Sequence, residues 1–305
     1  MKALVLAGPT GIGKSDLSVQ IAKSVFPDTF EIISSDSVQV YKYLNIGTGK
    51  LTSEEMRGIP HYLIDEVDPD FHFEVNEFIN RALKYSEIVL KHDRIPFFVG
   101  GSGLYLSSFF DGLSGVPEID PEVRKKITDE LHETSSQEMH DRLAAVDFQS
   151  SVKINPNDTQ RIIRALEVFR GTGKPLSFYQ NNRTGCRSDD TCFIGIDAGR
   201  EYIYDRINNR VDKMLENGLI NEVENILQMG FSQDLKSLNS IGYFEIIQYL
   251  NNKISLDEAV YLIKKNSRKY AKKQLTWFKR IDYINWFDVT DREGIYREIK
   301  NFLGC

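Results

Sequence analysis

The sequence is poor in the residues that stabilise secreted, zinc-binding or membrane-spanning proteins. Among 305 residues there are only three cysteines, at positions 186, 192 and 305, and no Cys-x-x-Cys pair. So few cysteines cannot cross-link a chain of this size, and the five histidines lack zinc-binding spacing. The longest stretch without charge, residues 95–110, is shorter than the roughly 20 residues of a spanning helix. We therefore expect a soluble, cytoplasmic protein with no membrane segment.

Basic residues are also outnumbered by acidic ones. There are 38 Lys and Arg against 44 Asp and Glu, which gives a net charge of −6. This balance argues against a nucleic-acid partner, because binding to phosphates is driven by basic charge. However, residues 264–280 contain eight Lys or Arg and no acid, so this basic segment carries +8 and the rest of the chain −14. The total therefore conceals a basic segment on an acidic body.

Alternating apolar runs and amphipathic stretches predict an α/β core. Short apolar runs at residues 3–7, 30–33 and 95–99 each end in a polar or glycine-rich turn. Helices are predicted between them, at residues 16–25 and 74–92. This alternation is typical of a parallel sheet with right-handed crossovers, which binds its ligands at the carboxyl ends of the strands.

A second region, residues 111–190, has the periodicity of helices only. We predict that it is a helical insertion domain between two segments of the core, residues 1–110 and 191–305. The core would then resume with a strand, a series of helices and a last strand, at residues 192–197, 200–281 and 284–289.

Residues 8–15, GPTGIGKS, match the phosphate-binding pattern G-x-x-x-x-G-K-[ST] without a mismatch. The glycines allow several backbone N–H groups to face one anion, and the helix N-terminus that follows adds partial positive charge. Lys14 supplies a full positive charge, and Ser15 offers a hydroxyl to a Mg²⁺ ion. The motif predicts a P-loop NTPase-like fold. The predicted diphosphate-binding residues are Gly8, Pro9, Thr10, Gly11, Ile12, Gly13, Lys14 and Ser15, with Ser15 as the metal ligand.

The loop alone does not identify the phosphate compound. A kinase or ATPase would also need an acid near the loop to hold the metal, and only Asp36, after the strand at 30–33, is placed for that. Asp36 therefore serves the metal or acts as a base on another substrate, and its position would equally suit a helix cap. Arg206 and Arg210 lie four residues apart on one helix face, which would also suit an ordinary solvent-exposed pair.

Over almost its whole length the chain resembles the tRNA dimethylallyltransferases, also called tRNA isopentenyltransferases. A phosphate-binding loop is common to a large superfamily, but its combination with the other shared motifs is specific. These motifs are GPTGIGKS (8–15), ISSDSVQVYKYLNIGTGK (33–50), PHYLID (60–65), PFFVGGSGLY (96–105), NDTQRIIRALEVFRGTGKP (157–175), DRINNRVDKMLENGLINEV (205–223), SIGYFE (240–245) and SRKYAKKQLTWF (267–278).

The resemblance implies a prenyl transfer in which the dimethylallyl group of dimethylallyl diphosphate moves to N6 of an adenine in tRNA. That adenine is at position 37, on the 3′ side of the anticodon, in tRNAs that read codons beginning with U. The loop then holds an allylic diphosphate, although its pattern is that of ATP-binding proteins. By resemblance, Asp36 is the catalytic base, Thr10 contacts the substrate and Arg206 stabilises the leaving diphosphate. The adenine would be flipped out of its stack to reach them.

The resemblance also implies contacts with the anticodon stem-loop, in a protein that we expect to be a monomer. On a helical projection, the bases of the basic segment share one side, and the other side holds Ile263, Tyr270, Trp277, Phe278 and Ile281. This predicts one face docked on the core and one face open to RNA, although a solvated or membrane-surface helix would look similar. The expected tRNA-binding residues are Asp36, Ser37, Val38, Gln39, Ser102, Arg124, Gln160, Arg161, Ile162, Ile163, Arg164, Lys272 and Lys273.

Three other functions compete with tRNA prenylation. A related enzyme could prenylate free adenosine phosphates, a small-molecule kinase could use the same loop, and an RNA-binding module could retain the loop without activity. The helical insertion and the basic segment favour a large RNA over a free nucleotide. Lys273 stands where the family usually has Arg, so a two-pronged phosphate contact is not expected there.

Overall fold

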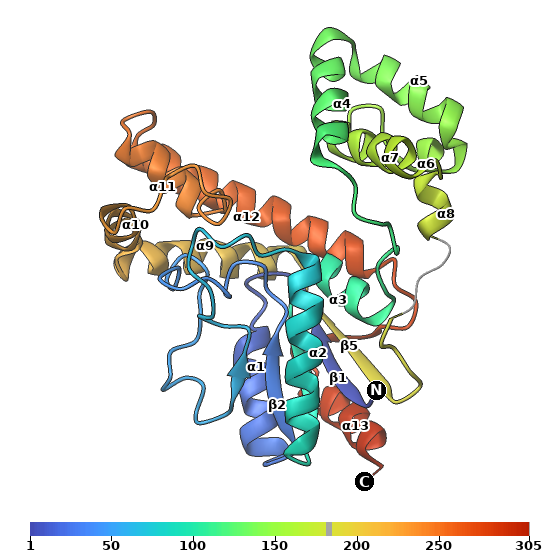
Figure 1. The fold of residues 1–305 in the computed structure, drawn as a ribbon. Helices are drawn as coiled ribbons and strands as arrows, with labels where there is room; N and C mark the ends of the chain where they lie inside the picture. Colours follow the sequence, from blue (N-terminus) through green and yellow to red (C-terminus); the bar gives the residue numbers. More distant parts are fainter. Residues whose placement is uncertain (181–184, 305) are drawn as a thin grey trace. The chain divides into compact units, whose positions relative to one another are not determined.

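The computed structural model describes residues 1–180 and 185–304. The chain divides into two compact units, and Figure 1 shows their elements. The first, which we call the α/β unit, comprises Met1–Phe109 and Arg187–Cys305. The second, the helical unit, is Phe110–Cys186. Among the described residues, none of the helices has both the length and the apolar character needed to cross a membrane.

The α/β unit is built on one sheet of six parallel strands in the order β3-β2-β4-β1-β5-β6. All five strands predicted from the sequence are present, so the predicted α/β class is confirmed. β3 was not predicted, because two residues are too few to show a period of two. The strands are β1 (Ala3–Ala7), β2 (Phe30–Ser34), β3 (His61–Tyr62), β4 (Ile95–Gly100), β5 (Thr191–Asp197) and β6 (Asn285–Asp288).

The strand order places a topological switch at β1. Ala7, the last residue of β1, pairs with Gly100 on β4 and with Gly195 on β5. After β1 the chain builds β2, β3 and β4 on one side, and later it builds β5 and β6 on the other. Ligand crevices in open parallel sheets form at such a point, outside the carboxyl ends of the strands. The phosphate-binding loop follows β1 directly and therefore lies there.

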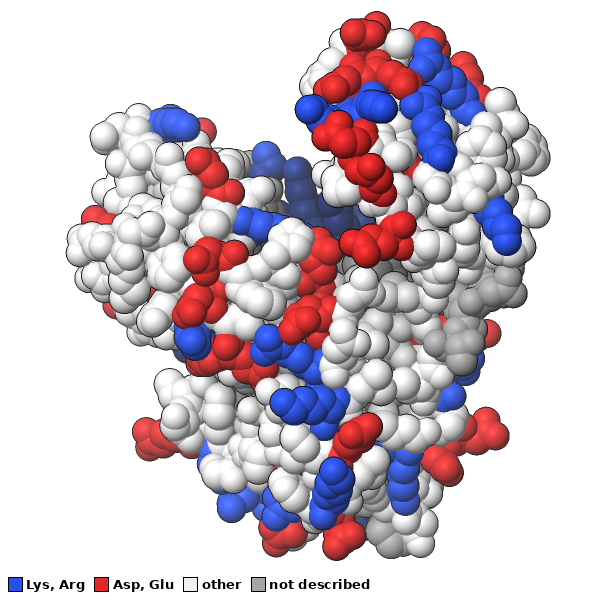
Figure 2. All heavy atoms as spheres, in the orientation of Figure 1, with Lys and Arg blue, Asp and Glu red and all other residues white. Residues whose placement is uncertain are grey.

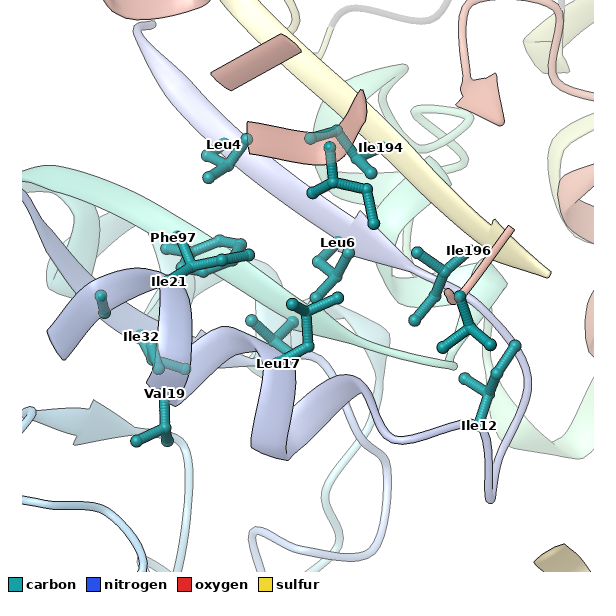
Figure 3. Packing of buried hydrophobic residues seen from close by; sticks show 14 of the residues in the cluster. Leu4, Leu6, Ile12, Leu17, Val19, Ile21, Ile32, Phe97, Ile194 and Ile196 are labelled. Atoms are coloured by element: carbon teal, nitrogen blue, oxygen red, sulfur yellow. The ribbon is translucent and has the colours of Figure 1, made fainter. Parts of the chain in front are cut away.

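Both faces of the sheet are covered, which explains why β1 is apolar at every position. One face packs Leu4, Leu6 and Phe97 against α1 (Lys14–Gln20) and the π-helical turn η1 (Ile21–Val25) that continues it (Figure 3). On β4, the neighbouring Phe98 instead contacts Phe109 of α3 (Gly103–Phe110), which also meets α2 (Val75–Lys91) through Phe78. This alternation between faces is the period of a strand.

The remaining helices of the α/β unit follow β5. The sequence predicted a helical series here, and it is present as four helices separated by turns. A final helix, α13, follows β6 and contributes Ile295 and Ile299 to the core beside the sheet, and it was not predicted. The helices are α9 (Arg200–Glu216), α10 (Leu219–Gln228), α11 (Tyr243–Leu250), α12 (Leu256–Phe278) and α13 (Arg292–Leu303).

The helical unit has a hydrophobic core of its own, formed by Ile127, Met139, Leu143, Ile162 and Leu166 with their neighbours. Four of its helices begin at a residue whose side chain accepts a backbone N–H of the first turn, which satisfies an otherwise unpaired donor. Its helices are α4 (Pro121–Glu133), α5 (Ser136–Val146), α6 (Phe148–Lys153), α7 (Thr159–Thr172) and α8 (Leu176–Gln180).

Candidate active site at the phosphate-binding loop

The loop between β1 and α1 has a backbone that only glycine adopts easily. Gly11 and Gly13 have φ angles of 80° and 98°, in the left-handed region. Gly8 has no space for a side chain, because a Cβ atom there would lie 2.7 Å from the Ile196 carbonyl oxygen. No side chain caps the N-terminus of α1, so its first N–H groups remain available to an anion. The glycines of the motif thus supply the left-handed and closely packed backbone that the loop adopts.

Lys14 is the first residue of α1, and its side chain reaches back to the loop, where its Nζ donates to the Pro9 carbonyl at 2.8 Å. Burial lowers the pKa of Lys14 to about 8, an effect that the charge of Asp36 opposes and that of Arg210 reinforces. A buried ammonium held this way is short of negative partners. A bound polyphosphate would supply them, so the site favours an anionic ligand.

Two arginines of α9 reach the loop from the side of β5. Arg206 is exposed and donates from Nε to the Gly11 carbonyl at 2.8 Å. Arg210 donates from Nη1 to the Thr10 hydroxyl at 3.2 Å and from Nη2 to the Thr48 carbonyl at 2.7 Å. Burial lowers its pKa, against the raising effect of Asp36. The spacing of four residues therefore places both side chains on the loop. The sequence assigned only Arg206 to the site, and the shared helix face was the signal for Arg210.

Asp36 lies just beyond β2, and its charge acts on both Lys14 and Arg210. Its Oδ1 accepts the backbone N–H groups of Val38 at 2.9 Å and Gln39 at 3.3 Å. Asp36 thus caps a turn with one oxygen, close to the cap considered from the sequence, although no helix follows. Within the described part of the chain, its Oδ2 has no hydrogen-bond partner, so this oxygen is available for chemistry.

Two cavities meet at these residues. The larger, about 940 Å³, is lined by the phosphate-binding loop together with polar side chains that include Lys14, Ser15 and Arg206. The smaller, about 320 Å³, has an apolar contribution from Ile207 and Ile263. Both lie within the α/β unit. The residues that line both cavities are Thr10, Asp36, Thr48, Arg210 and Met214.

Gln274 of α12 is a site residue to which the sequence reasoning assigned no role. Its side chain is buried, its Oε1 accepts the Thr10 N–H at 2.8 Å, and its Nε2 donates to the Gly101 carbonyl at 2.9 Å. It therefore joins the phosphate-binding loop to the turn after β4. Glycine at position 101 leaves room for this contact, because a Cβ there would displace Nε2 of Gln274. The signal in the sequence was a glutamine interrupting the apolar side of a helix.

The basic segment differs from its helical projection. Ile263 and Phe278 are buried as predicted, but Tyr270 and Trp277 are 38% and 36% exposed, and Ala271 and Gln274 are buried instead. The helix also ends at Phe278, before the last two bases. Two of the eight bases are neutralised by acids of other elements, through the ion pairs Lys264–Asp212 and Lys279–Asp197. Lys269, Lys272 and Lys273 are exposed and form no ion pair among the residues that the structure describes.

Tyr270 lies beside the predicted tRNA contact Ser102, which begins the turn into α3. Burial and the charge of Asp36 raise the pKa of Tyr270 to about 12, against hydrogen bonds from Ser102 and Gln274. Ser102 is itself 9% exposed. Ser37, Val38 and Gln39 lie in the turn that Asp36 caps and are half-buried. These residues therefore gather around Asp36.

In the helical unit, the predicted tRNA contacts on α7 divide by burial. Gln160, Arg161 and Arg164 are exposed. Ile162 and Ile163 are 1% and 8% exposed and belong to the core of the unit, so they offer no side-chain surface to RNA. The three arginines of the set are paired with acids, which are Asp158 for Arg161 and Glu167 for both Arg124 and Arg164.

Comparisons with known proteins match this chain over nearly its whole length. A family model described as IPP transferase matches residues 39–281, and one described as isopentenyl transferase matches residues 1–69. A tRNA dimethylallyltransferase of Thermoanaerobacter sp. (strain X514) is 44% identical, over 98% of this chain and 95% of that protein. One from Acetivibrio thermocellus is 43% identical, with the same coverage.

Solved structures are similar over the same length. The full-length tRNA isopentenylpyrophosphate transferase of Bacillus halodurans is 38% identical with a TM-score of 0.70, over 100% of this chain and 96% of that chain. A eukaryotic dimethylallyltransferase, described as acting on tRNA, is 30% identical with a TM-score of 0.77, over 95% of this chain and 74% of that one.

Proposed function

The chain belongs to the tRNA dimethylallyltransferase family, and we propose that it transfers the dimethylallyl group of dimethylallyl diphosphate to N6 of the adenine at tRNA position 37, in tRNAs that read codons beginning with U. The observation that carries this proposal is the placement of Asp36. It lies where a polar cavity lined by the phosphate-binding loop meets a smaller cavity with apolar walls. A diphosphate suits the first, and the prenyl group and the base meet beside the carboxylate.

The reaction breaks the bond between C1 of the prenyl group and the bridging oxygen, and the electron pair leaves with the diphosphate. The lone pair of adenine N6 forms the new bond to C1. Charge accumulates on the leaving diphosphate, where Lys14, Arg206 and the N–H groups of the loop stabilise it. These donors are fixed before the reaction by their contacts with the loop.

The proton released from N6 passes to Asp36 as the N–C bond forms. The two backbone N–H groups on Oδ1 fix the orientation of this carboxylate, and Oδ2 is left to accept the proton. Thr10 has a related arrangement. Its hydroxyl accepts a hydrogen bond from Arg210, so its own proton can be donated to the substrate.

We also propose that Mg²⁺ accompanies the diphosphate, with the Ser15 hydroxyl as a ligand. The residues fit this ion, because Mg²⁺ prefers oxygen ligands, keeps several waters and is usually bound through phosphates rather than by a protein cage. In the described residues no group of three or more His, Cys, Asp or Glu could hold a metal by itself. When bound, the ion would add positive charge at the leaving group.

The tRNA would bind through its anticodon stem-loop, and Lys272 and Lys273 would be among the residues that contact it. An adenine in a stacked loop cannot reach a carboxylate at a cavity wall, so the base must be flipped out. Tyr270 is partly exposed and lies beside Asp36, so its ring is placed to stack on the flipped adenine. We propose that the protein acts as a monomer in the cytoplasm.

The test is to incubate the protein with labelled dimethylallyl diphosphate, Mg²⁺ and unmodified tRNA, and to locate the label by nuclease mapping. We expect label on the adenine at position 37. The same assay with AMP in place of tRNA tests the free-nucleotide alternative, and release of phosphate from ATP tests the kinase alternative. Tight tRNA binding without transfer would indicate an RNA-binding module. Any of these three outcomes in place of labelled tRNA would overturn the proposal.

A further inference from the structure

Three motifs of the sequence have no role in the mechanism above, and the structure brings them together at one carboxylate. They are residues 45–50, 219–223 and 240–245. Glu222 of α10 accepts with Oε2 the backbone N–H groups of Asn45 at 3.0 Å and Ile46 at 2.7 Å. Its Oε1 accepts the N–H of Gly47 at 3.2 Å and the hydroxyl of Tyr243 at 2.6 Å. One side chain thus holds three consecutive amides of a loop that is more than 170 residues away in sequence.

The loop at residues 45–49 is fitted closely to its surroundings. Gly47 lies against the ring of Tyr243, which is fully buried, and a Cβ at this position would overlap that ring. Gly49 has a φ angle of 59°, and a Cβ there would lie 2.5 Å from Nη2 of Arg210. The two glycines therefore allow the loop to pass between Tyr243 and Arg210, and larger residues would displace it.

The loop in turn holds two groups of the active site. The Thr48 carbonyl accepts Nη2 of Arg210 at 2.7 Å and Nε2 of Gln39 at 3.3 Å. The other terminal nitrogen of Arg210 donates to the Thr10 hydroxyl, and the backbone N–H of Gln39 donates to Oδ1 of Asp36. Each step from Glu222 to Thr10 and Asp36 is thus a hydrogen bond or a covalent connection, along the backbone or within the side chains of Arg210 and Gln39.

We propose that Glu222 is a positioning residue for the diphosphate site. By fixing residues 45–47 it sets the place of the Thr48 carbonyl, which orients the guanidinium of Arg210 toward Thr10. Glu222 itself does not line either cavity. This inference rests on the proposed function for its effect on catalysis, but its effect on the loop and on diphosphate binding is independent of prenyl transfer.

A carboxylate is required because all four contacts need an acceptor. The bonds to N–H groups are charge-assisted, so they are stronger than those to a neutral amide. In Glu222→Gln, the remaining oxygen can serve Asn45 and Ile46, while the NH₂ group faces Gly47. Glu222→Ala removes all acceptors and leaves three loop amides without this partner. The loss should therefore increase from wild type through Gln to Ala.

The experiment compares Glu222→Ala and Glu222→Gln with the matched control Glu224→Ala. Glu224 is on the same helix, and among the described residues its side chain forms no hydrogen bond or ion pair. Three quantities are measured on the full chain: hydrogen exchange of amides 45–49, the Kd for inorganic pyrophosphate with Mg²⁺, and the KM values for prenyl donor and tRNA. A misplacement of about 1 Å costs about 100-fold in rate.

For Glu222→Ala we therefore expect faster exchange at residues 45–49 only, a weaker pyrophosphate Kd, and a loss of about 100-fold in kcat/KM for the donor, with the KM for tRNA unchanged. Glu222→Gln should be intermediate, and Glu224→Ala should equal wild type. A general loss of folding would instead lower the apparent kcat with both KM values unchanged, and would overturn the proposal. Unchanged exchange and pyrophosphate binding in Glu222→Ala would also overturn it. Failure of wild type to prenylate any RNA would remove the proposed function but not the loop and pyrophosphate results.

Discussion

Replacement of Gln274 by Leu tests whether α12 fixes the phosphate-binding loop. Leu is similar in size to Gln, but it removes the acceptor for the Thr10 N–H and the donor to the Gly101 carbonyl. The carbonyl keeps a bond from the N–H of Gly103, whereas the Thr10 N–H loses its partner. An unsatisfied buried donor costs about 1–3 kcal/mol and a lost net hydrogen bond about 1 kcal/mol. Because the cavity admits water to Thr10, we expect a total near the lower end, about 2 kcal/mol.

For a unit of this size, about 2 kcal/mol corresponds to a fall in Tm of roughly 4–8 °C. This fall in Tm is measured by thermal unfolding of the full chain, followed by circular dichroism. A second variant, Gln274→Glu, keeps the acceptor for Thr10 but places an oxygen against the Gly101 carbonyl, so the two variants separate the two bonds. Gln228→Leu is the control, since Gln228 is exposed on α10.

The same variant should impair catalysis well below its Tm. Thr10 would move with its freed N–H, and its hydroxyl would lose alignment with Arg210, so kcat/KM for the prenyl donor should fall by about 100-fold. If Gln274→Leu kept its Tm within about 1 °C of wild type and its donor kcat/KM within about twofold, the two hydrogen bonds of Gln274 would not hold the loop, and the reasoning would be refuted.

Further predictions follow from the charges of the two units. Asp36→Asn keeps an acceptor for the capped turn but not the base, so transfer in single-turnover assays should fall at least about 100-fold while pyrophosphate binding persists; loss of binding would place Asp36 in the metal site. Because the pKa of Lys14 is lowered to about 8, Lys14 loses its proton above that pH, and the affinity for pyrophosphate should weaken there. Lys14→Arg should abolish this change with pH, since arginine stays charged. A change that persisted in this variant would belong to another group. Burial alone raises the pKa of Asp147, but the hydrogen bonds from Ser150 and Ser177 outweigh it and lower the pKa, so its contribution to stability is present above the unfolded pKa and lost as pH falls through the folded one. Asp147→Asn should accordingly speed hydrogen exchange in α6 and α8 but not in β1, and equal rates would show that the serine contacts are weak. Lys272→Ala with Lys273→Ala should lower the slope of log Kd for tRNA against log salt by roughly 1.5–2, and an unchanged slope would mean that both side chains face only solvent.

Local sequence signals were sufficient for five of the six strands and for the loop, because their causes are local. The apolar run of β1 and the glycines at 11 and 13 are local signals, since a strand buried on both faces is mostly apolar and a left-handed backbone favours glycine. The partners of Gln274 and Glu222 are different. The hydrogen-bond partners of Gln274 are 173 and 264 residues away in sequence, and those of Glu222 are up to 177 residues away. No periodicity within a short stretch of sequence could therefore reveal them.

The helical projection of the basic segment was wrong about Tyr270 and Trp277 for a related reason. A projection assumes that one side of a helix is buried and that apolar residues fill it. α12 packs against both α9 and α11, and its buried residues include Ala259 and Ala271, whose small side chains allow close helix contact. The two aromatic rings are consequently left at the edge of the buried surface. There Trp277 covers Gly103, the first residue of α3, and its Nε1 donates to the hydroxyl of Ser107 in the same helix.

The distribution of charge finally changes the meaning of the net −6. Of the eight bases in the basic segment, Lys264 and Lys279 are paired with acids, and Arg268 is bound by Asn208. Over much of the α/β unit in Figure 2, basic and acidic side chains are interspersed, while a group of basic side chains lies in the recessed part of the view. A surface of mixed charge binds a polyanion weakly and without specificity, since the affinity for phosphates increases with the number of Lys and Arg residues that contact them. The bases left unpaired on α12, and those that converge on the phosphate-binding loop, are therefore the positions where an anion gains most. An acidic protein can in this way bind both a diphosphate and an RNA, because each is met by a few bases at a defined place rather than by the total charge.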